Sequence, residues 1–232
     1  MIYVVIGPTG VGKTKFSEML AKEKNAIIIN ADSMQIYKGL NIGTAKIKEN
    51  EKENVPHFLF DIKNINEEYN AYLYQKDGRK LLDKYKNENI VIVGGTGLYI
   101  KALLYDYNFN LKTSSAKKLY NFKIIGLTKD RESLYKDINK RVDLMIKEGL
   151  LEEAYKVYKT KDKNHSVKTS IGYKELFPYF ENKISLEEAI ENIKKNSRHY
   201  AKRQYTFFKN QFENVYWINI EEVPFSKLIK DL

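Results

Sequence analysis

The stretch GPTGVGKT at positions 7–14 constrains the fold of this chain more than any other feature. It follows the short apolar run IYVVI (2–6) and precedes a helical pattern over 13–24. A loop of the form GxxxxGKS/T between a strand and a helix cradles phosphate with its backbone amides and the helix N-terminus. Lys13 adds a positive charge, and the Thr14 hydroxyl suits a Mg²⁺ ion bound with the phosphate. We therefore predict a phosphate site here, with Mg²⁺ as cofactor and Thr14 as its protein ligand.

Short apolar runs alternate with helical patterns along the rest of the chain. This alternation predicts an α/β fold with a parallel, doubly wound sheet, flanking helices and a helical C-terminal part. A length of 232 residues fits one domain over 1–232. The polar stretches 108–118 and 160–170 are predicted as loops or linkers. Strands are predicted over 2–6, 26–30, 57–62, 89–93, 122–127 and 215–220, and helices over 13–24, 67–86, 98–107, 130–159 with a break near Gly149, and 185–212.

Composition excludes several classes of protein. The chain has no cysteine, which rules out disulfides, zinc–thiolate sites, iron–sulfur clusters and a cysteine nucleophile. No apolar run is long enough to span a bilayer, and the short N-terminal run leads directly into the phosphate loop rather than resembling a signal peptide. We therefore expect a cytoplasmic protein without a membrane partner.

Positive charge gathers in one segment. The chain carries a formal charge of +10, and residues 194–209 hold six Lys or Arg and no acid. Such a cluster favours a polyanionic partner such as nucleic acid, although a solvated surface in a lysine-rich chain would also account for the excess. Helical spacing predicts a basic face and a separate core face. The basic face comprises Lys195, Arg198, Lys202 and Lys209, and the core face Tyr205, Phe208 and Phe212.

The acid that usually accompanies a phosphate loop is missing from its usual place. In nucleotide hydrolases an Asp at the end of a later apolar strand holds magnesium, but the run NIVIV ends in Gly94. The available acid is Asp32, which follows the run AIIIN. Strand ends line the ligand crevice in such sheets, so Asp32 is expected to bind metal or accept a proton. Spacing leaves an equal alternative, in which Asp32 or Ser33 caps the segment that follows.

Several motifs together resemble the tRNA dimethylallyltransferase (IPP transferase) family. They occur in the order GPTGVGKT, ADSMQIYKGLNIGTAK (31–46), PHFLFDI (56–62), GGTGLYIKALL (94–104), SIGYKEL (170–176) and AKRQYTFFK (201–209). The resemblance implies a P-loop NTPase-like fold, similar to a nucleotide kinase, in which nothing is phosphorylated. It implies transfer of a dimethylallyl group from dimethylallyl diphosphate to N6 of adenosine 37, beside the anticodon of tRNA.

The resemblance also implies a role for each motif. Asp32 is the general base, Thr96 lies beside it, and Lys13 holds the leaving diphosphate with Thr14 and Mg²⁺. The arginines of the helix beginning at 130 are implied to reach the diphosphate, more so for Arg131 than for Arg141, the alternative being a salt-bridged surface. The implied diphosphate-binding residues are Gly7, Pro8, Thr9, Gly10, Val11, Gly12, Lys13, Thr14, Arg131 and Arg141. The implied tRNA-binding residues are Asp32, Ser33, Met34, Gln35, Thr96, Lys118, Ser170, Ile171, Gly172, Tyr173, Lys174, Lys202, Arg203, Gln204 and Lys209.

The chain departs from the family pattern after residue 107. The family carries a helical insertion of several dozen residues there, whereas here the short linker 108–118 leads directly to the run FKIIGL. Over 114–118 the chain has Ser and Lys where the family has Asp and Arg. Four interpretations follow: a minimal, monomeric enzyme acting on the tRNA anticodon stem-loop, transfer to free AMP, ADP or ATP, a small-molecule or nucleotide kinase, and a non-catalytic RNA-binding relic. The retained SIGYKEL and AKRQY segments favour tRNA.

Overall fold

The core of the computed structural model is a six-stranded parallel sheet, and the structure describes residues 1–110, 113–160, 165–230 and 232. The strand order is β3-β2-β4-β1-β7-β8, so the chain starts in the middle and winds outward to both edges. This is the α/β class that the sequence predicted. The strands are β1 Ile2–Ile6, β2 Ala26–Asn30, β3 His57–Phe58, β4 Asn89–Val93, β7 Phe122–Thr128 and β8 Val215–Asn219.

Helices cover both faces of the sheet because successive side chains of a strand point to opposite faces. Tyr3 and Val5 of β1 pack into one core with helices α1 (Lys13–Glu23) and α9 (Phe225–Lys230). Val4 and Ile6 pack into the other core with α2 (Ala71–Lys84) and α3 (Gly97–Leu104). Burial on both faces explains why these strands read as continuous apolar runs.

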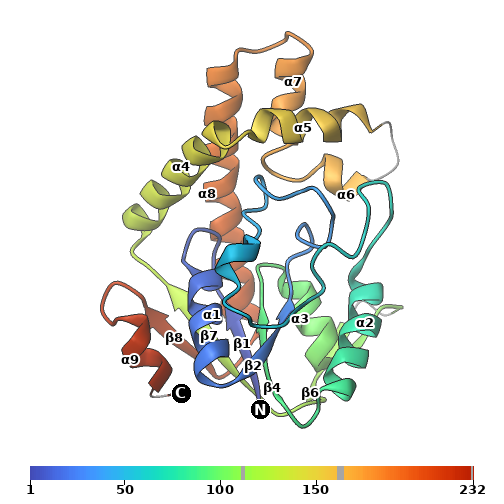
Figure 1. Ribbon diagram of the computed structural model, residues 1–232, viewed down its shortest axis with the longest axis vertical. Helices are drawn as coiled ribbons and strands as arrows, with labels where there is room; N and C mark the ends of the chain where they lie inside the picture. The colour runs from blue at the N-terminus through green and yellow to red at the C-terminus, as the bar shows by residue number, and fades with distance from the viewer. Residues whose placement is uncertain (111–112, 161–164, 231) are drawn as a thin grey trace.

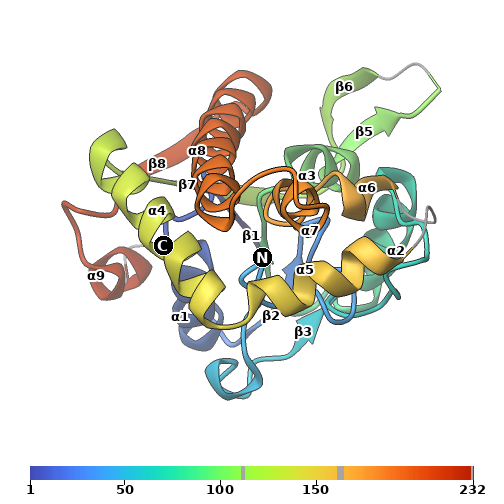
Figure 2. The same cartoon turned by 90° about the horizontal axis from the view of Figure 1, so that it is seen from above.

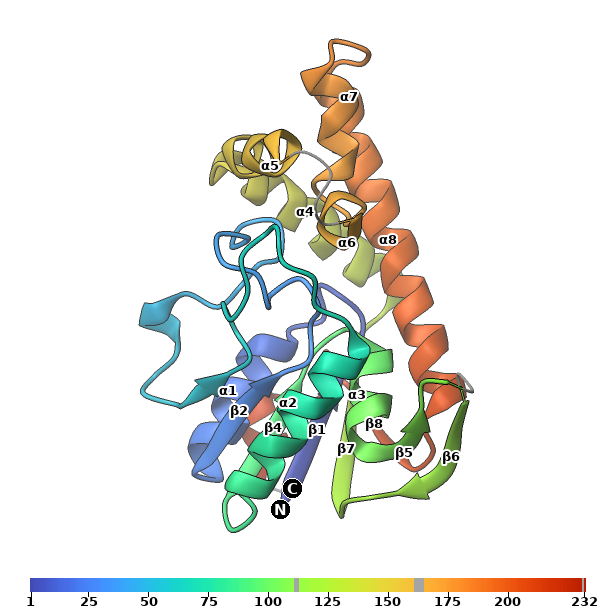
Figure 3. The ribbon, with the colours of Figure 1, turned by 90° about the vertical axis from the view of Figure 1, so that its right-hand side faces the viewer.

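A second layer of helices stands over the carboxyl ends of the strands, and we call it the helical cap (Figure 1). The views from above and from the side show α5 and α7 in the cap, with α8 running from the cap down along the sheet (Figures 2 and 3). Gly149, with φ 104°, separates α4 from α5 at the predicted break. The cap contains α4 Arg131–Lys147, α5 Leu150–Lys159, α6 His165–Lys168, the 3-10 helix η2 Lys174–Leu176, α7 Phe177–Phe180 and α8 Leu186–Gln211. A further 3-10 helix, η1 Glu49–Glu51, lies between β2 and β3.

Two predicted elements differ from the structure. The strand predicted over 57–62 covers only His57–Phe58, because Leu59 and Asp61 adopt φ values of 62° and 53° that break the ladder. The helix predicted over 98–107 ends at Leu104, and the chain continues as a strand from Tyr105. The Arg79 guanidinium donates to the carbonyls of residues 102, 103 and 105 and so satisfies the end of the helix.

The predicted linker 108–118 is part of a β-hairpin. Strand β5 (Tyr105–Asn108) pairs antiparallel with β6 (Thr113–Lys118), and Figure 3 shows this pair beside α3 and the lower end of α8. Of the predicted loop 160–170, helix α6 occupies His165–Lys168, and positions 161–164 lie outside the described residues. Within the described ranges, no helix combines the length and apolar character needed to cross a membrane.

We predict that Gly94→Ala destabilises the protein strongly. A Cβ at Gly94 would lie 2.1 Å from the carbonyl carbon of Ala31, so two backbone segments would have to separate. We expect a loss of about 3 kcal/mol or more in the free energy of unfolding. Gly39→Ala is the matched control, because Gly39 has open space around it and only a φ of 76° to strain, which costs about 1 kcal/mol. Urea unfolding of both variants measures the difference, and equal losses would contradict the steric argument.

Candidate active site at the carboxyl ends of the strands

The phosphate loop joins β1 to α1 with the geometry that the sequence predicted. Gly10 and Gly12 adopt φ values of 83° and 90°, which glycine tolerates at little cost. The first turn of α1 contains no acidic side chain, so its N-terminus is free to attract an anion. The Lys13 ammonium lies half-buried and donates to the carbonyls of Gly7, at 3.0 Å, and Pro8, at 2.9 Å.

Asp32 lies just beyond the end of β2, and its backbone is fixed on both sides. Its amide donates to Asn30 Oδ1 at 2.9 Å, and its carbonyl accepts from Asn30 Nδ2 at 3.0 Å. Its Oδ1 accepts from the amide of Met34 at 3.0 Å, which closes a turn, since no regular helix follows. The carboxylate therefore closes the turn with Oδ1, and Asp32 also lines the cavities above the strand ends. The capping and functional interpretations of Asp32 are compatible.

Thr96 supports the Asp32 segment from the neighbouring strand. Its hydroxyl oxygen accepts from the amide of Ser33 at 3.0 Å and donates to Ser33 Oγ at 3.2 Å. Its own amide donates to the carbonyl of Ala31 at 3.1 Å. Thr96 holds the 31–33 segment through these bonds and lines neither of the two cavities above the strand ends.

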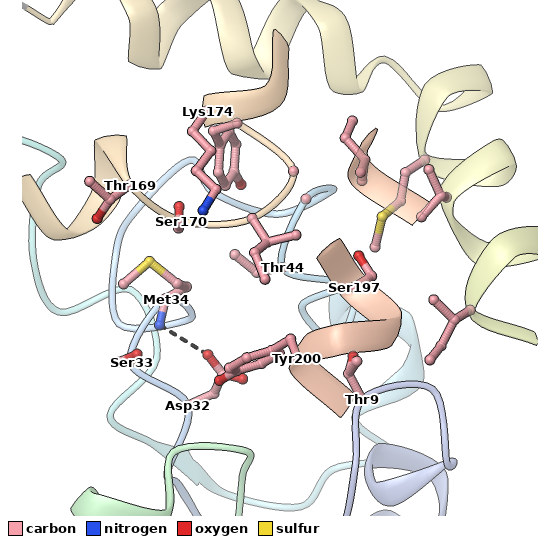
Figure 4. A pocket seen from close by; sticks show the side chains of 18 of the residues that line it. Thr9, Asp32, Ser33, Met34, Thr44, Thr169, Ser170, Lys174, Ser197 and Tyr200 are labelled. Carbon is pink, nitrogen blue, oxygen red and sulfur yellow. Dashed lines mark hydrogen bonds between the residues drawn. The ribbon is translucent and has the colours of Figure 1, made fainter. Parts of the chain in front are cut away.

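Two cavities meet above the strand ends. The cap cavity, of about 340 Å³, lies under the helical cap and combines apolar side chains of α4 and α8 with the 169–174 segment. The loop cavity, of about 380 Å³, contains Lys13, Thr14 and Gln35. Figure 4 shows Asp32 and Tyr200 facing the cap cavity on one side, with Ser170 and Lys174 on the other. Both cavities are lined by Thr9, Asp32, Thr44 and Arg141.

Arg141 is the cation at this junction. Its Nη1 donates to Thr9 Oγ1 at 3.2 Å, and its Nη2 makes a long contact of 3.5 Å with the carbonyl of Thr44. Its Nε is buried without a hydrogen-bond partner, and no carboxylate of the described chain pairs with it. Burial lowers the pKa of Arg141, and the nearby Asp32 opposes that shift. A half-buried guanidinium with spare donors favours an anionic ligand.

Arg131 does not reach the site. It is the first residue of α4, is exposed, and lays its guanidinium over the ring of Tyr135 at 5.2 Å. It lines neither cavity. The sequence-based preference for Arg131 over Arg141 is therefore reversed, because Arg131 lies at the start of α4, whereas Arg141 lies nearly three turns further along the helix, where its guanidinium reaches Thr9.

The segment 170–174 lies across the cap cavity from Asp32, but only part of it is accessible. Ser170, Ile171 and Lys174 offer surface to the cavity. Tyr173 is fully buried and its hydroxyl donates to Glu153 at 2.7 Å, while the amide of Gly172 donates to Glu175 at 2.9 Å. Ser33 and Met34 line the cap cavity, and Gln35 lines the loop cavity.

Gln204, predicted to contact tRNA, instead lies inside the protein. It is 5 % exposed, accepts from the amide of Thr9 at 2.8 Å and donates to the carbonyl of Gly95 at 3.0 Å. Both ends of its amide hold the phosphate loop against the 94–97 turn, and its burial keeps the side chain from the surface that RNA could contact. This corrects the prediction, and the reason is the rotation of α8, which buries Gln204 together with Ala201 and Phe208.

The other basic positions lie on the surface. Arg203 lines the cap cavity, whereas Lys202 and Lys209 are exposed on α8. Lys118 is exposed on the hairpin, over the ring of Phe122. The predicted core face of this helix is confirmed: Phe208 and Phe212 are buried, and Tyr205 packs on Trp217.

Sequence reasoning missed several residues in and around the site, among them Thr44, which lines both cavities. Tyr200 borders Asp32 in the cap cavity, and burial together with the Asp32 charge raises its pKa. Its signal was available, since it lies within the basic segment at a helical spacing of three from Ser197, which lines the same cavity. Glu153 accepts four hydrogen bonds beneath the 41–43 loop, and nothing in the local sequence distinguishes it from Glu152.

The chain's own residues suit Mg²⁺ only in part. Within the described ranges, no three His, Cys, Asp or Glu side chains come together as a metal cage. Thr14 and Asp32 both line the loop cavity. Mg²⁺ commonly takes one or two protein ligands and completes its shell with phosphate oxygens and water. The donor set therefore fits a magnesium ion that arrives with a phosphorylated ligand.

The sheet order, the phosphate loop and the cap place this chain in the P-loop class of α/β proteins. A family profile described as IPP transferase matches residues 35–119 and 110–211. The chain belongs to the IPP transferase family.

Three similar proteins bear this out. A protein of Anoxybacillus flavithermus named tRNA dimethylallyltransferase is 38 % identical, over 100 % of this chain and 94 % of that protein. The crystal structure of a tRNA isopentenylpyrophosphate transferase from Bacillus halodurans is 35 % identical, with a TM-score of 0.91 over 99 % of this chain and 93 % of that one. The corresponding Staphylococcus epidermidis structure is 32 % identical, with a TM-score of 0.90 over 99 % and 96 %.

The length comparison supports a missing segment. The alignment to the A. flavithermus protein runs over 294 positions, 62 more than the 232 residues of this chain. The two segments matched by the family profile meet over 110–119, which is where the sequence analysis expected the absent insertion. The hairpin β5–β6 occupies that place here.

We predict that Arg141→Ala weakens binding of pyrophosphate by roughly 10- to 100-fold, because hydrogen bonds to a charged ligand from a half-buried guanidinium are lost. Arg131→Ala is the matched control, since it removes the same charge from the same helix outside both cavities. Isothermal titration calorimetry measures both dissociation constants. Equal weakening in the two variants would mean that only the overall charge matters.

We predict that pyrophosphate binding weakens as pH rises above about 8. Burial lowers the pKa of Lys13 to about 8, Asp32 opposes this shift, and Arg141 adds to it. The charged ammonium is therefore complete below that pH and is lost above it, so affinity falls between about pH 7 and pH 9.5. Calorimetry in buffers of different ionisation enthalpy also detects the proton taken up on binding near pH 8. Lys13→Met is the control. We expect it to bind pyrophosphate more weakly, with an affinity that does not change over this pH range.

Proposed function

We propose that this chain transfers a dimethylallyl group from dimethylallyl diphosphate to N6 of adenosine 37 in tRNA. Family membership and the names of its relatives support the reaction class. The single observation that carries the assignment of roles is the position of Asp32, which lines both cavities. A base at that junction stands between a cationic phosphate site and a second pocket large enough for a planar ring.

The diphosphate belongs in the loop cavity. The amides of the phosphate loop, the Lys13 ammonium and the Arg141 guanidinium all face this volume. They stabilise the negative charge that develops as the carbon–oxygen bond of the donor breaks. Mg²⁺, held by Thr14 and diphosphate oxygens, would supply further charge neutralisation for the leaving group. The apolar side chains of α4 that border the cap cavity, Ile138, Val142 and Met145, suit the isoprenoid carbons.

The adenine belongs in the cap cavity with its amino group near Asp32. An exocyclic amine is a poor nucleophile, because its lone pair is delocalised into the ring, and it gains from a base that removes its proton. The nitrogen forms the new bond to the allylic carbon as diphosphate departs, and the Asp32 carboxylate receives the N6 proton. Tyr200 beside Asp32 keeps its own proton at neutral pH, because burial raises its pKa, and can donate a hydrogen bond.

The anticodon loop approaches from the mouth of the cap cavity. The target base must leave its stack to enter, and Ser170, Lys174 and Arg203, which line the cavity, are available to contact the flanking nucleotides. The exposed Lys202 and Lys209 extend a cationic surface along α8 for phosphate contacts, which give affinity without sequence reading. A tRNA substrate places the reaction in the cytoplasm, and we expect the enzyme to act as a monomer.

One observation favours a second acceptor. The chain lacks about 60 aligned positions of its A. flavithermus relative, which reduces the surface available for RNA. Transfer to the amino group of free AMP, ADP or ATP would use the same Asp32 and the same loop cavity. The two acceptors differ in product, so one experiment separates them.

We predict that expression in a host without its own tRNA prenyltransferase restores N6-dimethylallyl-adenosine in tRNA, measured by mass spectrometry of tRNA nucleosides. Asp32→Asn keeps the turn to Met34 but removes the base, and we expect a rate loss of about 10²- to 10⁴-fold. Asp106→Asn, at an exposed carboxylate on the hairpin, is the control and should leave the product unchanged. Prenylated AMP without modified tRNA would move the assignment to the free nucleotide, and full activity of Asp32→Asn would remove Asp32 from its role.

A further inference from the structure

Glu153 is a buried carboxylate that connects the helical cap to the sheet layer. It lies on α5, is 8 % exposed, and forms no ion pair within the described part of the chain. Its Oε2 accepts from the amides of Asn41, at 2.8 Å, and Ile42, at 2.9 Å. Its Oε1 accepts from the amide of Gly43 at 2.9 Å and from the Tyr173 hydroxyl at 2.7 Å. Four donors from two distant segments thus neutralise one charge.

The 41–43 loop is also fixed sterically. A Cβ at Gly43 would lie 2.7 Å from the Tyr173 hydroxyl and 3.0 Å from Leu150 Cδ1, so the loop backbone lies directly against the cap. The burial of Glu153 costs free energy unless its oxygens are satisfied, and the three loop amides with the Tyr173 hydroxyl satisfy them here. The NIGTAK motif therefore has a physical role: its consecutive amides form the receptor for a carboxylate from α5.

Thr44, the next residue, connects this loop to the site. The Thr44 carbonyl accepts from Gln35 Nε2 at 3.1 Å and contacts Arg141 Nη2 at 3.5 Å, and Thr44 lines both cavities. Its hydroxyl donates to the Leu40 carbonyl at 2.7 Å, which closes the loop on itself. Apart from Thr9, this carbonyl is the only hydrogen-bonding partner of the Arg141 guanidinium within the described residues.

We propose that Glu153 is a positioning residue for anion binding, which acts through the 41–44 loop to set the Arg141 guanidinium at the junction of the cavities. This inference rests on the proposed function in assigning the diphosphate to Arg141. Glu153 touches no substrate itself. Replacing its charge with an amide leaves a donor facing backbone donors, so the loop shifts and Arg141 loses its carbonyl partner.

The test is a double-mutant cycle of Glu153→Gln and Arg141→Ala, in which the dissociation constant for pyrophosphate is measured for each variant. We expect Glu153→Gln to raise this constant about tenfold in the wild-type background. In the Arg141→Ala background the same substitution should change it less than about twofold, because the residue it acts through is gone. Glu152→Gln, the exposed neighbour on the same helix, is the matched control and should have no effect in either background.

The thermal midpoint of each variant, measured without ligand, separates positioning from stability. A structural role alone would lower the midpoint of Glu153→Gln equally in both backgrounds and leave the dissociation constant unchanged, and that result would overturn the inference. If Glu153→Gln does not fold, Tyr173→Phe replaces it, because this variant removes only one of the four donors. We expect it to raise the dissociation constant for pyrophosphate by a smaller factor. Absence of pyrophosphate binding by the wild-type protein would instead refute the diphosphate site of the proposed function.

Discussion

Three charges lie close together above the carboxyl ends of the strands, and the rest of the site depends on their balance. Asp32 raises the pKa of Lys13 and of Arg141 against the lowering effect of burial. The two cations exceed the one anion, so the junction attracts a negatively charged ligand. Within the described residues, the Asp32 carboxylate forms no salt bridge with either cation. Lys13 instead donates to loop carbonyls and Arg141 to Thr9, while Asp32 lines both cavities.

Such a balance requires backbone segments that do not move apart, and buried polar side chains provide this rigidity. Gln204 joins the phosphate loop to the 94–97 turn, Thr96 joins that turn to the Asp32 segment, and Glu153 joins the 41–43 loop to the cap. Each uses side-chain atoms to satisfy backbone groups that the sheet edge leaves unpaired. Catalytic groups need supports of this kind, because the gain from orientation is lost with small displacements.

The sequence predicted the sheet, the phosphate loop and Asp32 because each has a local signal. Continuous apolar runs indicate doubly covered strands, and glycines at fixed spacing indicate the loop. The position of a helix residue relative to the site was harder to predict, since it depends on where α4 begins and on how α8 is rotated against the sheet. That is why Arg131 was preferred over Arg141 and why Gln204 was assigned to tRNA. Glu153 could not be distinguished from Glu152 without knowing that three amides from residues 41–43 converge on it.

The hairpin β5–β6 shows how the chain can lack about 60 positions of its relative without disturbing the site. The helix α3 ends where Arg79 satisfies the carbonyls of residues 102, 103 and 105, and β6 leads directly into β7. Figure 3 shows the hairpin beside α3, and none of its described residues lines either cavity. A segment can be lost between two fixed ends with little cost to the fold. The shortening therefore bears on how the acceptor is held, whereas the groups that perform the transfer stay in place.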